Sequence, residues 1–221
     1  MKIDLSKIFC LTCEPENGRK RTHIKNIIPT VEFVEPIIGI AKNKSGASGT
    51  LRMVERGLIS QIQQSPFQPF LMIEDDISLF RPIEPIDIPD GADILYVGIS
   101  KCSMNDHQFH YDNYYEAVPE YPQIVRIKHM LSTHGIVICS PLGAAVFQRT
   151  MLEVFLSDKP WDIPLALIQP YYMVYALREP FVYQDAEYNG DEGCTRFQLQ
   201  GPDKELPAEW ITRDLATIRM L

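Results

Sequence analysis

Short apolar segments alternate with amphipathic ones through the first 160 residues of the chain. The apolar segments have the length and the β-branched content of buried strands. The predicted strands are residues 7–13, 31–34, 37–40, 70–73, 94–97, 124–127, 136–139 and 181–183. Apolar residues at helical spacing predict helices at residues 19–28, 50–64 and 140–156, another from Asp162 and a last one from Pro207.

This alternation predicts an α/β fold with a mostly parallel central sheet flanked by helices. The chain of 221 residues suits a single domain, residues 1–221. In such sheets, ligands bind beyond the carboxyl ends of the strands. Residues 42–49 are rich in glycine and lysine and predict a loop, with Ser48 or Thr50 capping the helix that follows. Residues 98–122 are polar and aromatic without a clear period, which predicts a long functional loop.

Charge and hydropathy narrow the possible partners. The net charge of −8 argues against nucleic acid, which requires a clustered basic surface. No apolar run has the roughly 18 residues that a membrane span requires, and the first residues lack the apolar stretch of a signal peptide. We therefore expect a soluble, cytoplasmic protein.

The most informative motif is an acidic triplet, Glu74, Asp75 and Asp76, directly after an apolar strand. Side chains alternate along an extended chain, so Glu74 and Asp76 are expected on one side and Asp75 on the other. Two carboxylates at the end of a strand suit a hard cation such as Mg²⁺ or Mn²⁺, and such a cation assists the departure of a diphosphate. The alternative is a solvated acidic turn without a ligand.

Several segments resemble the family-25-type glycosyltransferases, which include lipooligosaccharide and collagen sugar transferases and similar enzymes of large DNA viruses. The run FLMIEDDISLF resembles the LILEDDV segment of that family. KSGASGTLRMVERGL is similar to the glycine-containing start of the preceding helix, and ADILYVG to the D-x-LYLG strand. MLSTHGIVICSPLGAAVF and FVYQ resemble two later segments, and all these segments follow the family order over residues 7–185.

The resemblance implies a GT-A (Rossmann-like) domain, a nucleotide-diphosphate sugar donor such as a UDP-sugar, and a carbohydrate or other hydroxyl acceptor. It divides the chain into a nucleotide-sugar-binding half (1–100), an acceptor-binding half (101–205) and a C-terminal helix (206–221). It also implies Mn²⁺ or Mg²⁺ held by Glu74 and Asp76, with Asp75 beside the donor. No histidine follows His134, so the C-terminal histidine ligand of many GT-A enzymes has no counterpart here. A viral member would act in the host cytoplasm.

The same fold places the nucleotide at the first strand and the following helix. Leu11 and Thr12 would line the base and ribose pocket, and Arg19 or Arg21 would lie near phosphate. Around the predicted glycine loop, Lys44, Ser45 and Arg52 suit an anion at a helix N-terminus. His134 is expected to form hydrogen bonds at the donor site.

An inverting transfer needs a base that takes the proton of the acceptor hydroxyl. Asp162 is the first candidate because it opens a helix beside Trp161, an aromatic side chain that can stack on a sugar. A purely structural role for Asp162, as the cap of that helix, is the alternative. Asp191 is the rival candidate for the base.

Two other functions fit parts of the sequence. A Mg²⁺-dependent nucleotidyltransferase also places carboxylates after a strand, but the first strand-to-helix turn here, Glu14-Pro15-Glu16, lacks a phosphate-binding glycine signature. A glycan-binding module with a vestigial acidic triplet is the non-enzymatic alternative.

Overall fold

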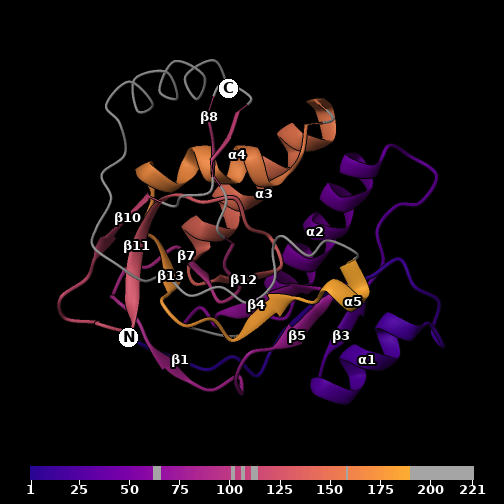
Figure 1. The fold of residues 1–221 in the computed structure, drawn as a ribbon, viewed down its shortest axis with the longest axis horizontal. Helices are drawn as coiled ribbons and strands as arrows, with labels where there is room; N and C mark the ends of the chain where they lie inside the picture. The colour runs from indigo at the N-terminus through magenta and orange to yellow at the C-terminus, as the bar shows by residue number, and fades with distance from the viewer. Residues whose placement is uncertain (62–65, 101–102, 106–107, 111–113, 158, 190–221) are drawn as a thin grey trace.

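The computed structural model describes residues 1–61, 66–100, 103–105, 108–110, 114–157 and 159–189. An eight-stranded sheet runs through its centre in the order β10-β11-β13-β7-β12-β4-β2-β3 (Figure 1). In that order the strands are Tyr114–Ala117, Ile124–His129, Val174–Leu177, Ile94–Tyr96, Gly135–Ile138, Phe70–Glu74, Ile8–Leu11 and Glu32–Val34. The chain is therefore α/β, as its pattern predicts.

The sheet is mixed, so the prediction of a mostly parallel sheet is wrong. Strand β2 pairs in parallel with β3 and β4, and β13 pairs in parallel with β7. The remaining neighbours, including both partners of β12, are antiparallel. Parallel neighbours need a crossover connection, usually a helix. The described residues between β4 and β12 contain strands and no helix, so this part of the chain reverses direction instead.

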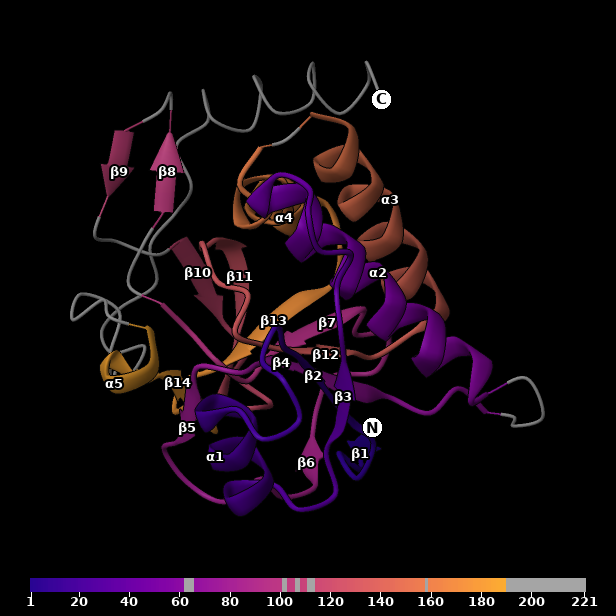
Figure 2. The same ribbon diagram turned by 90° about the vertical axis from the view of Figure 1, so that its right-hand side faces the viewer.

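Helices cover both faces of the sheet. Helices α2 (Lys42–Ile59), α3 (Pro141–Ser157) and α4 (Asp162–Ile168) lie on one face, and α1 (Arg19–Ile27) lies on the other (Figures 1 and 2). Each face has its own apolar core layer. Strand β4 contributes to both layers by alternation, Phe70 and Met72 on the side of α2 and α3, and Leu71 and Ile73 on the side of α1.

Helix α2 begins at Lys42, so the predicted loop 42–49 is helical and the predicted start at Thr50 is wrong. Ala41 holds the N-cap position and makes no side-chain cap bond, so the usual sequence signal for a helix start is missing. The hydroxyls of Ser48 and Thr50 donate to helix carbonyls at 2.7 Å and cap nothing. Gly49 faces Leu11 so closely that a β-carbon there would collide with it. The glycine therefore allows the helix to approach β2.

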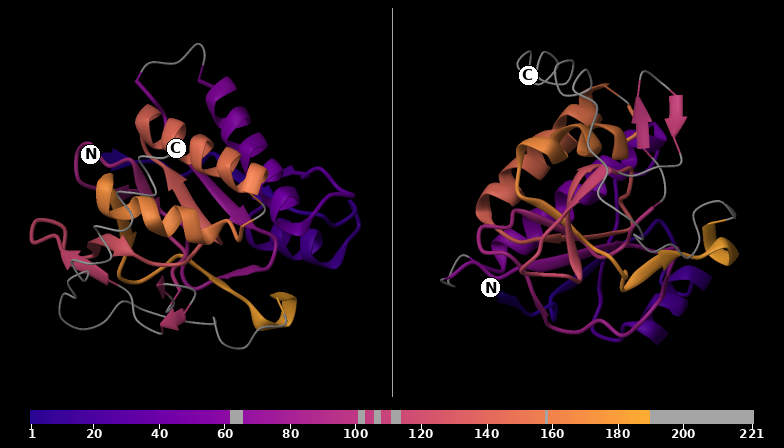
Figure 3. Two further views of the ribbon diagram at one scale, coloured as in Figure 1. Left: turned by 90° about the horizontal axis from the view of Figure 1, so that it is seen from above. Right: turned by 60° about the vertical axis from the view of Figure 1, so that its left-hand side comes forward.

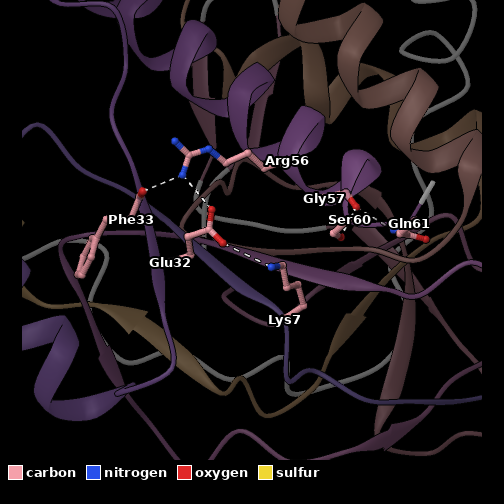
Figure 4. Close-up of polar contacts among 7 residues, drawn as sticks. All are labelled: Lys7, Glu32, Phe33, Arg56, Gly57, Ser60 and Gln61. Atoms are coloured by element: carbon pink, nitrogen blue, oxygen red, sulfur yellow. Dashed lines mark hydrogen bonds and ion pairs between the residues drawn. The ribbon is translucent and has the colours of Figure 1, made fainter. Parts of the chain in front are cut away.

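The C-terminal end of α2 forms polar contacts with the edge strand β3 (Figure 4). Arg56 donates from Nη1 to Glu32 Oε1 at 2.9 Å and to the Phe33 carbonyl at 3.2 Å. Ser60 Oγ donates to the carbonyl of Gly57 at 2.7 Å, just past the last helical residue. Helix α2 thus spans from the carboxyl ends of the central strands to the edge of the sheet.

Shorter elements surround this frame. Strands β1 (Lys2–Ile3) and β6 (Ile86–Asp87) pair with each other, as do β5 (Ile77–Leu79) and β14 (Val182–Gln184). The predicted long loop at 98–122 instead contains β8 (Ser103–Asn105), β9 (Gln108–His110) and β10, with β8 and β9 to one side of the main sheet (Figure 3). The 3-10 helix η1 (Gln169–Tyr171) and helix α5 (Ala186–Asn189) complete the described elements. The predicted helix from Pro207 lies outside the described residues.

No helix in the described part of the chain combines the length and the apolar character that crossing a bilayer requires.

Candidate functional site

A cavity of about 690 Å³ opens beyond the carboxyl ends of β2 and β4. Its walls come from the ends of these strands, the linker between β3 and α2, the first turn of α2, the segment before β12 and the start of α4. The lining residues include Leu11, Cys13, Pro36, Ile38, Ser45, Glu74, Asp76, Thr133, His134, Trp161, Asp162 and Gln184. Its volume lies within the usual range for small-molecule sites.

The acidic triplet divides between two directions, as predicted, although Asp75 and Asp76 lie in the turn after β4 and not on an extended strand. Glu74 and Asp76 line the cavity. Asp75 points to α1 and the end of β2, where Thr12 Oγ1 donates to it at 2.6 Å and Lys20 Nζ lies 3.3 Å away. Asp75 is therefore balanced by protein partners, and it fixes Thr12 behind the cavity wall.

Glu74 ends β4 and carries its carboxylate into a crowded acidic region. Thr133 Oγ1 donates to it at 2.6 Å, and Gln184 Nε2 donates at 3.3 Å. Burial raises the pKa of Glu74 to about 8, and the negative charge of Asp76 adds to that rise. Asp162 acts in the same direction, so the three carboxyl groups share one electrostatic environment. A cation bound there would relieve the repulsion between them.

Asp76 is a buried carboxyl group with an oxygen that is unpaired within the described part of the chain. Only 8% of the residue is exposed, and burial raises the pKa of its carboxyl group. Its buried Oδ1 finds no hydrogen-bond partner among the described residues. Buried carboxylate oxygens are normally paired or bound to a cation, so this oxygen is an open ligand position.

The residues present fit Mg²⁺ or Mn²⁺, although the protein alone does not complete the coordination. Within the described residues, no group of three or more His, Cys, Asp or Glu side chains is placed to hold a metal. Mg²⁺ is commonly held by one or two carboxylates, with waters and substrate phosphates completing its shell. Glu74 and Asp76 match that pattern, since their oxygens are hard donors facing an open cavity.

His134 lines the same cavity from the segment before β12. The residue is 1% exposed, its Nδ1 lies 3.4 Å from Ser132 Oγ, and Nε2 has no partner among the described residues. Burial lowers the pKa of His134 to about 4, so the imidazole is neutral near pH 7. A neutral imidazole can exchange a hydrogen bond with a ligand hydroxyl without adding charge.

The buried imidazole predicts a pH dependence of stability. Between pH 7 and pH 5 the unfolded chain protonates His134, whereas the folded protein does not, because its pKa of about 4 lies below this range. The unfolded state gains protons, so stability is present above about pH 6.5 and falls as the pH falls. Urea unfolding should show that the wild type loses about 2 kcal/mol more than His134→Asn over this interval. Equal losses in both proteins would contradict the assignment.

Asp162 is the first residue of α4, and Trp161 holds the N-cap position, so the alternative role of Asp162 as the N-cap is off by one position. Burial raises the pKa of Asp162, against hydrogen bonds from the N–H groups of Asp162 and Ile163, which lower it. Asp162 and Trp161 both line the cavity. The carboxyl group of Asp162 therefore lies at the first turn of α4, close to its backbone N–H groups, in a residue that lines the cavity.

The structure brings only some of the predicted donor-binding residues to the cavity. Leu11 and Ser45 line it. Arg19, Lys44 and Arg52 do not: Arg19 forms an ion pair with Glu187, and Arg52 donates to the Glu35 carbonyl at 2.7 Å. Because α2 already begins at Lys42, the side chains of its first turn that line the cavity are those of Lys42, Asn43 and Ser45.

Thr133 and Gln184 contact Glu74, and the sequence did not predict them as site residues. Both are polar residues at the ends of apolar strands, which is the signal that could have identified them. Gln184 lies 110 positions from Glu74 in the chain, so only the pairing of β14 with β5 brings them together. Asp191, the rival candidate for the base, lies outside the described residues.

Comparisons with known proteins add no family assignment. No protein-family model matches the chain, and a search of curated proteins finds no match. The residues that meet in the cavity at the end of β4 are therefore the basis for assigning a function.

Proposed function

We propose that the chain is a metal-dependent glycosyltransferase that moves a sugar from a nucleotide-diphosphate donor, a UDP-sugar, to a hydroxyl group of a glycan or other acceptor. One observation carries the proposal: Asp76, whose buried Oδ1 has no hydrogen-bond partner among the described residues, lines a cavity of about 690 Å³ beside a second carboxylate, Glu74. This arrangement suits a ligand that brings a cation and negatively charged oxygens together.

The donor would lie along the wall formed by Leu11, Ser45 and the carboxylates. Leu11 and Pro36 supply apolar surface for a nucleobase, and the first turn of α2 directs backbone N–H groups and Lys42 toward an anion. Glu74 and Asp76 would hold Mn²⁺ or Mg²⁺, which when bound offsets the negative charge that develops on the departing diphosphate. His134, neutral and buried, would accept a hydrogen bond from a hydroxyl of the sugar nucleotide or donate one to it.

Asp162 is the group best placed to act as the base. As the acceptor oxygen forms its bond to the sugar carbon, the acceptor proton passes to the Asp162 carboxylate. The bond from the sugar to the diphosphate breaks at the same time, and its electron pair leaves with the nucleoside diphosphate. The pKa of Asp162 is raised by burial, which makes its carboxylate a better proton acceptor than an exposed one. Trp161 beside it offers a flat apolar surface for a sugar ring.

A thermal-shift screen of nucleotide sugars with and without Mn²⁺ tests this function. We expect a nucleotide-diphosphate sugar to raise the melting temperature by several degrees with Mn²⁺ and much less with EDTA, because ligand binding to the folded state stabilises it. The products of the ligand that binds should include a free nucleoside diphosphate. Release of pyrophosphate would instead indicate a nucleotidyltransferase, and binding without turnover would indicate a glycan- or nucleotide-binding module.

A further inference from the structure

Gln184 is joined to the acidic triplet by backbone and side-chain bonds, although it comes from the far end of the described chain. Its strand β14 pairs antiparallel with β5, in the register Gln184 opposite Ile77. The N–H of the next residue, Asp185, donates to the carbonyl of Asp76 at 2.8 Å. The carboxylate of Asp185 also accepts from Ser78 Oγ at 2.7 Å. These links fix the backbone of Gln184 beside the turn that follows β4.

The side chain of Gln184 lies between the two carboxylates that face the cavity. Its Nε2 donates to Glu74 Oε2 at 3.3 Å, and the same amide is close enough to Asp76 to lower the pKa of that carboxyl group, against the larger effect of burial. Glu74, Asp76 and Gln184 all line the cavity. One amide group therefore lies within hydrogen-bonding reach of both acids.

The cluster of Glu74, Asp76 and Gln184 contains a buried carboxyl oxygen that is free, within the described part of the chain, to bind a ligand, which a solvated acidic turn would not contain. Asp76 lines the cavity and is more than nine-tenths buried, and its Oδ1 has no hydrogen-bond partner among the described residues. A glutamine amide carries two N–H donors and one carbonyl acceptor, and a half turn about its last torsion exchanges them with little change of shape.

We propose that Gln184 is a third oxygen ligand for the divalent cation, whose amide N–H groups bridge Glu74 and Asp76 without the cation and whose Oε1 turns to it when it binds. The inference rests on the metal dependence proposed above. An amide oxygen is a hard donor of the kind that Mg²⁺ and Mn²⁺ accept.

The neutrality of this third ligand has a consequence for the order of binding. A third carboxylate would add another buried negative charge beside Glu74 and Asp76. With an amide, the protein supplies only two negative charges, so cation affinity is modest until the donor diphosphate adds its own. The cation and the nucleotide diphosphate should therefore bind cooperatively.

Binding of Mn²⁺ alone, followed by the electron paramagnetic resonance signal of the free ion, tests this role. Gln184→Ala should weaken Mn²⁺ binding about tenfold, the lower end of what loss of a supporting ligand costs. Gln184→Glu should tighten it about tenfold, because a charged oxygen replaces a neutral one. The same variant should melt at a lower temperature without Mn²⁺ and recover with it. Gln68→Glu adds the same charge at the exposed, opposite end of β4 and should change neither quantity.

The sign of the Gln184→Glu effect decides the inference. If Gln184 serves only as a hydrogen-bond donor to the two acids, glutamate repels them, and Gln184→Glu weakens Mn²⁺ binding as much as Gln184→Ala does. Suppose that the wild type binds Mn²⁺, that Asp76→Asn abolishes this binding, and that Gln184→Glu fails to tighten it. This result would overturn the role of Gln184 and leave the metal dependence of the proposed function intact. Absence of saturable Mn²⁺ binding by the wild type would overturn it together with the metal dependence of the proposed function.

Discussion

Asp76→Asn is expected to reduce sugar transfer by at least about a thousandfold, the loss that follows removal of a group that helps stabilise charge in the transition state. The variant should also lose most of the Mn²⁺-dependent part of donor binding, because the neutral amide removes one of the two negative charges that would hold the cation. Transfer assays and donor titrations with Mn²⁺ and with EDTA measure both effects.

The fold should survive this substitution. Burial raises the pKa of Asp76, so the folded protein disfavours its charged form, and neutral asparagine removes that cost. The melting temperature of Asp76→Asn should therefore equal or exceed that of the wild type. Asp87→Asn, on the exposed side of β6, removes one charge away from the cavity and should leave transfer unchanged. Donor binding that stays strictly Mn²⁺-dependent in Asp76→Asn would show that Asp76 is not the ligand.

Asp162→Asn has the second largest expected effect, a fall in transfer of at least about a hundredfold. Asparagine has nearly the same volume, and its side-chain oxygen still accepts the N–H groups of the first turn of α4. It cannot accept the acceptor proton. Donor affinity and melting temperature should therefore stay close to those of the wild type, whereas the rate constant for transfer should fall.

Comparison of Asp162→Asn with Asp162→Ala separates catalysis from helix stability. The alanine variant also lacks a side-chain acceptor for the backbone N–H groups of this turn. Its free energy of unfolding should fall by about 1 kcal/mol, which lowers the melting temperature. If the asparagine variant transfers sugar at the wild-type rate, Asp162 is structural, and the base is Asp191 or the mechanism is retaining.

The sequence predicts the elements best where local pattern decides them. Strand β4 follows from a run of apolar residues. Asp75 points away from its two neighbours as predicted, although Asp75 and Asp76 lie in the turn that follows the strand. Helix α3 is predicted almost to the residue because Ser140 and Pro141 form a strong start signal, and the structure has Ser140 Oγ accepting the N–H of Gly143 at 2.9 Å.

The predictions that are wrong concern features that depend on residues far apart in the sequence. Strand direction depends on how the chain returns to the sheet, so the antiparallel placement of β12 could not be read from its four apolar residues. The start of α2 carries no cap signal, and Gly46 and Gly49 are residues typical of a loop. Only the structure shows that Gly49 packs against Leu11 of β2. Arg19 looked like a phosphate ligand because its partner, Glu187, is 168 positions away.

The central claim is that the cavity beside Glu74 and Asp76 holds a divalent cation together with a nucleotide diphosphate. The most direct measurement is anomalous X-ray diffraction at the manganese absorption edge from crystals grown with Mn²⁺ and UDP. We expect an anomalous peak within coordination distance of Asp76, with the diphosphate of UDP in the cavity. Manganese and nucleotide bound elsewhere on the protein, or a cavity that stays free of both at saturating concentrations, would contradict the claim.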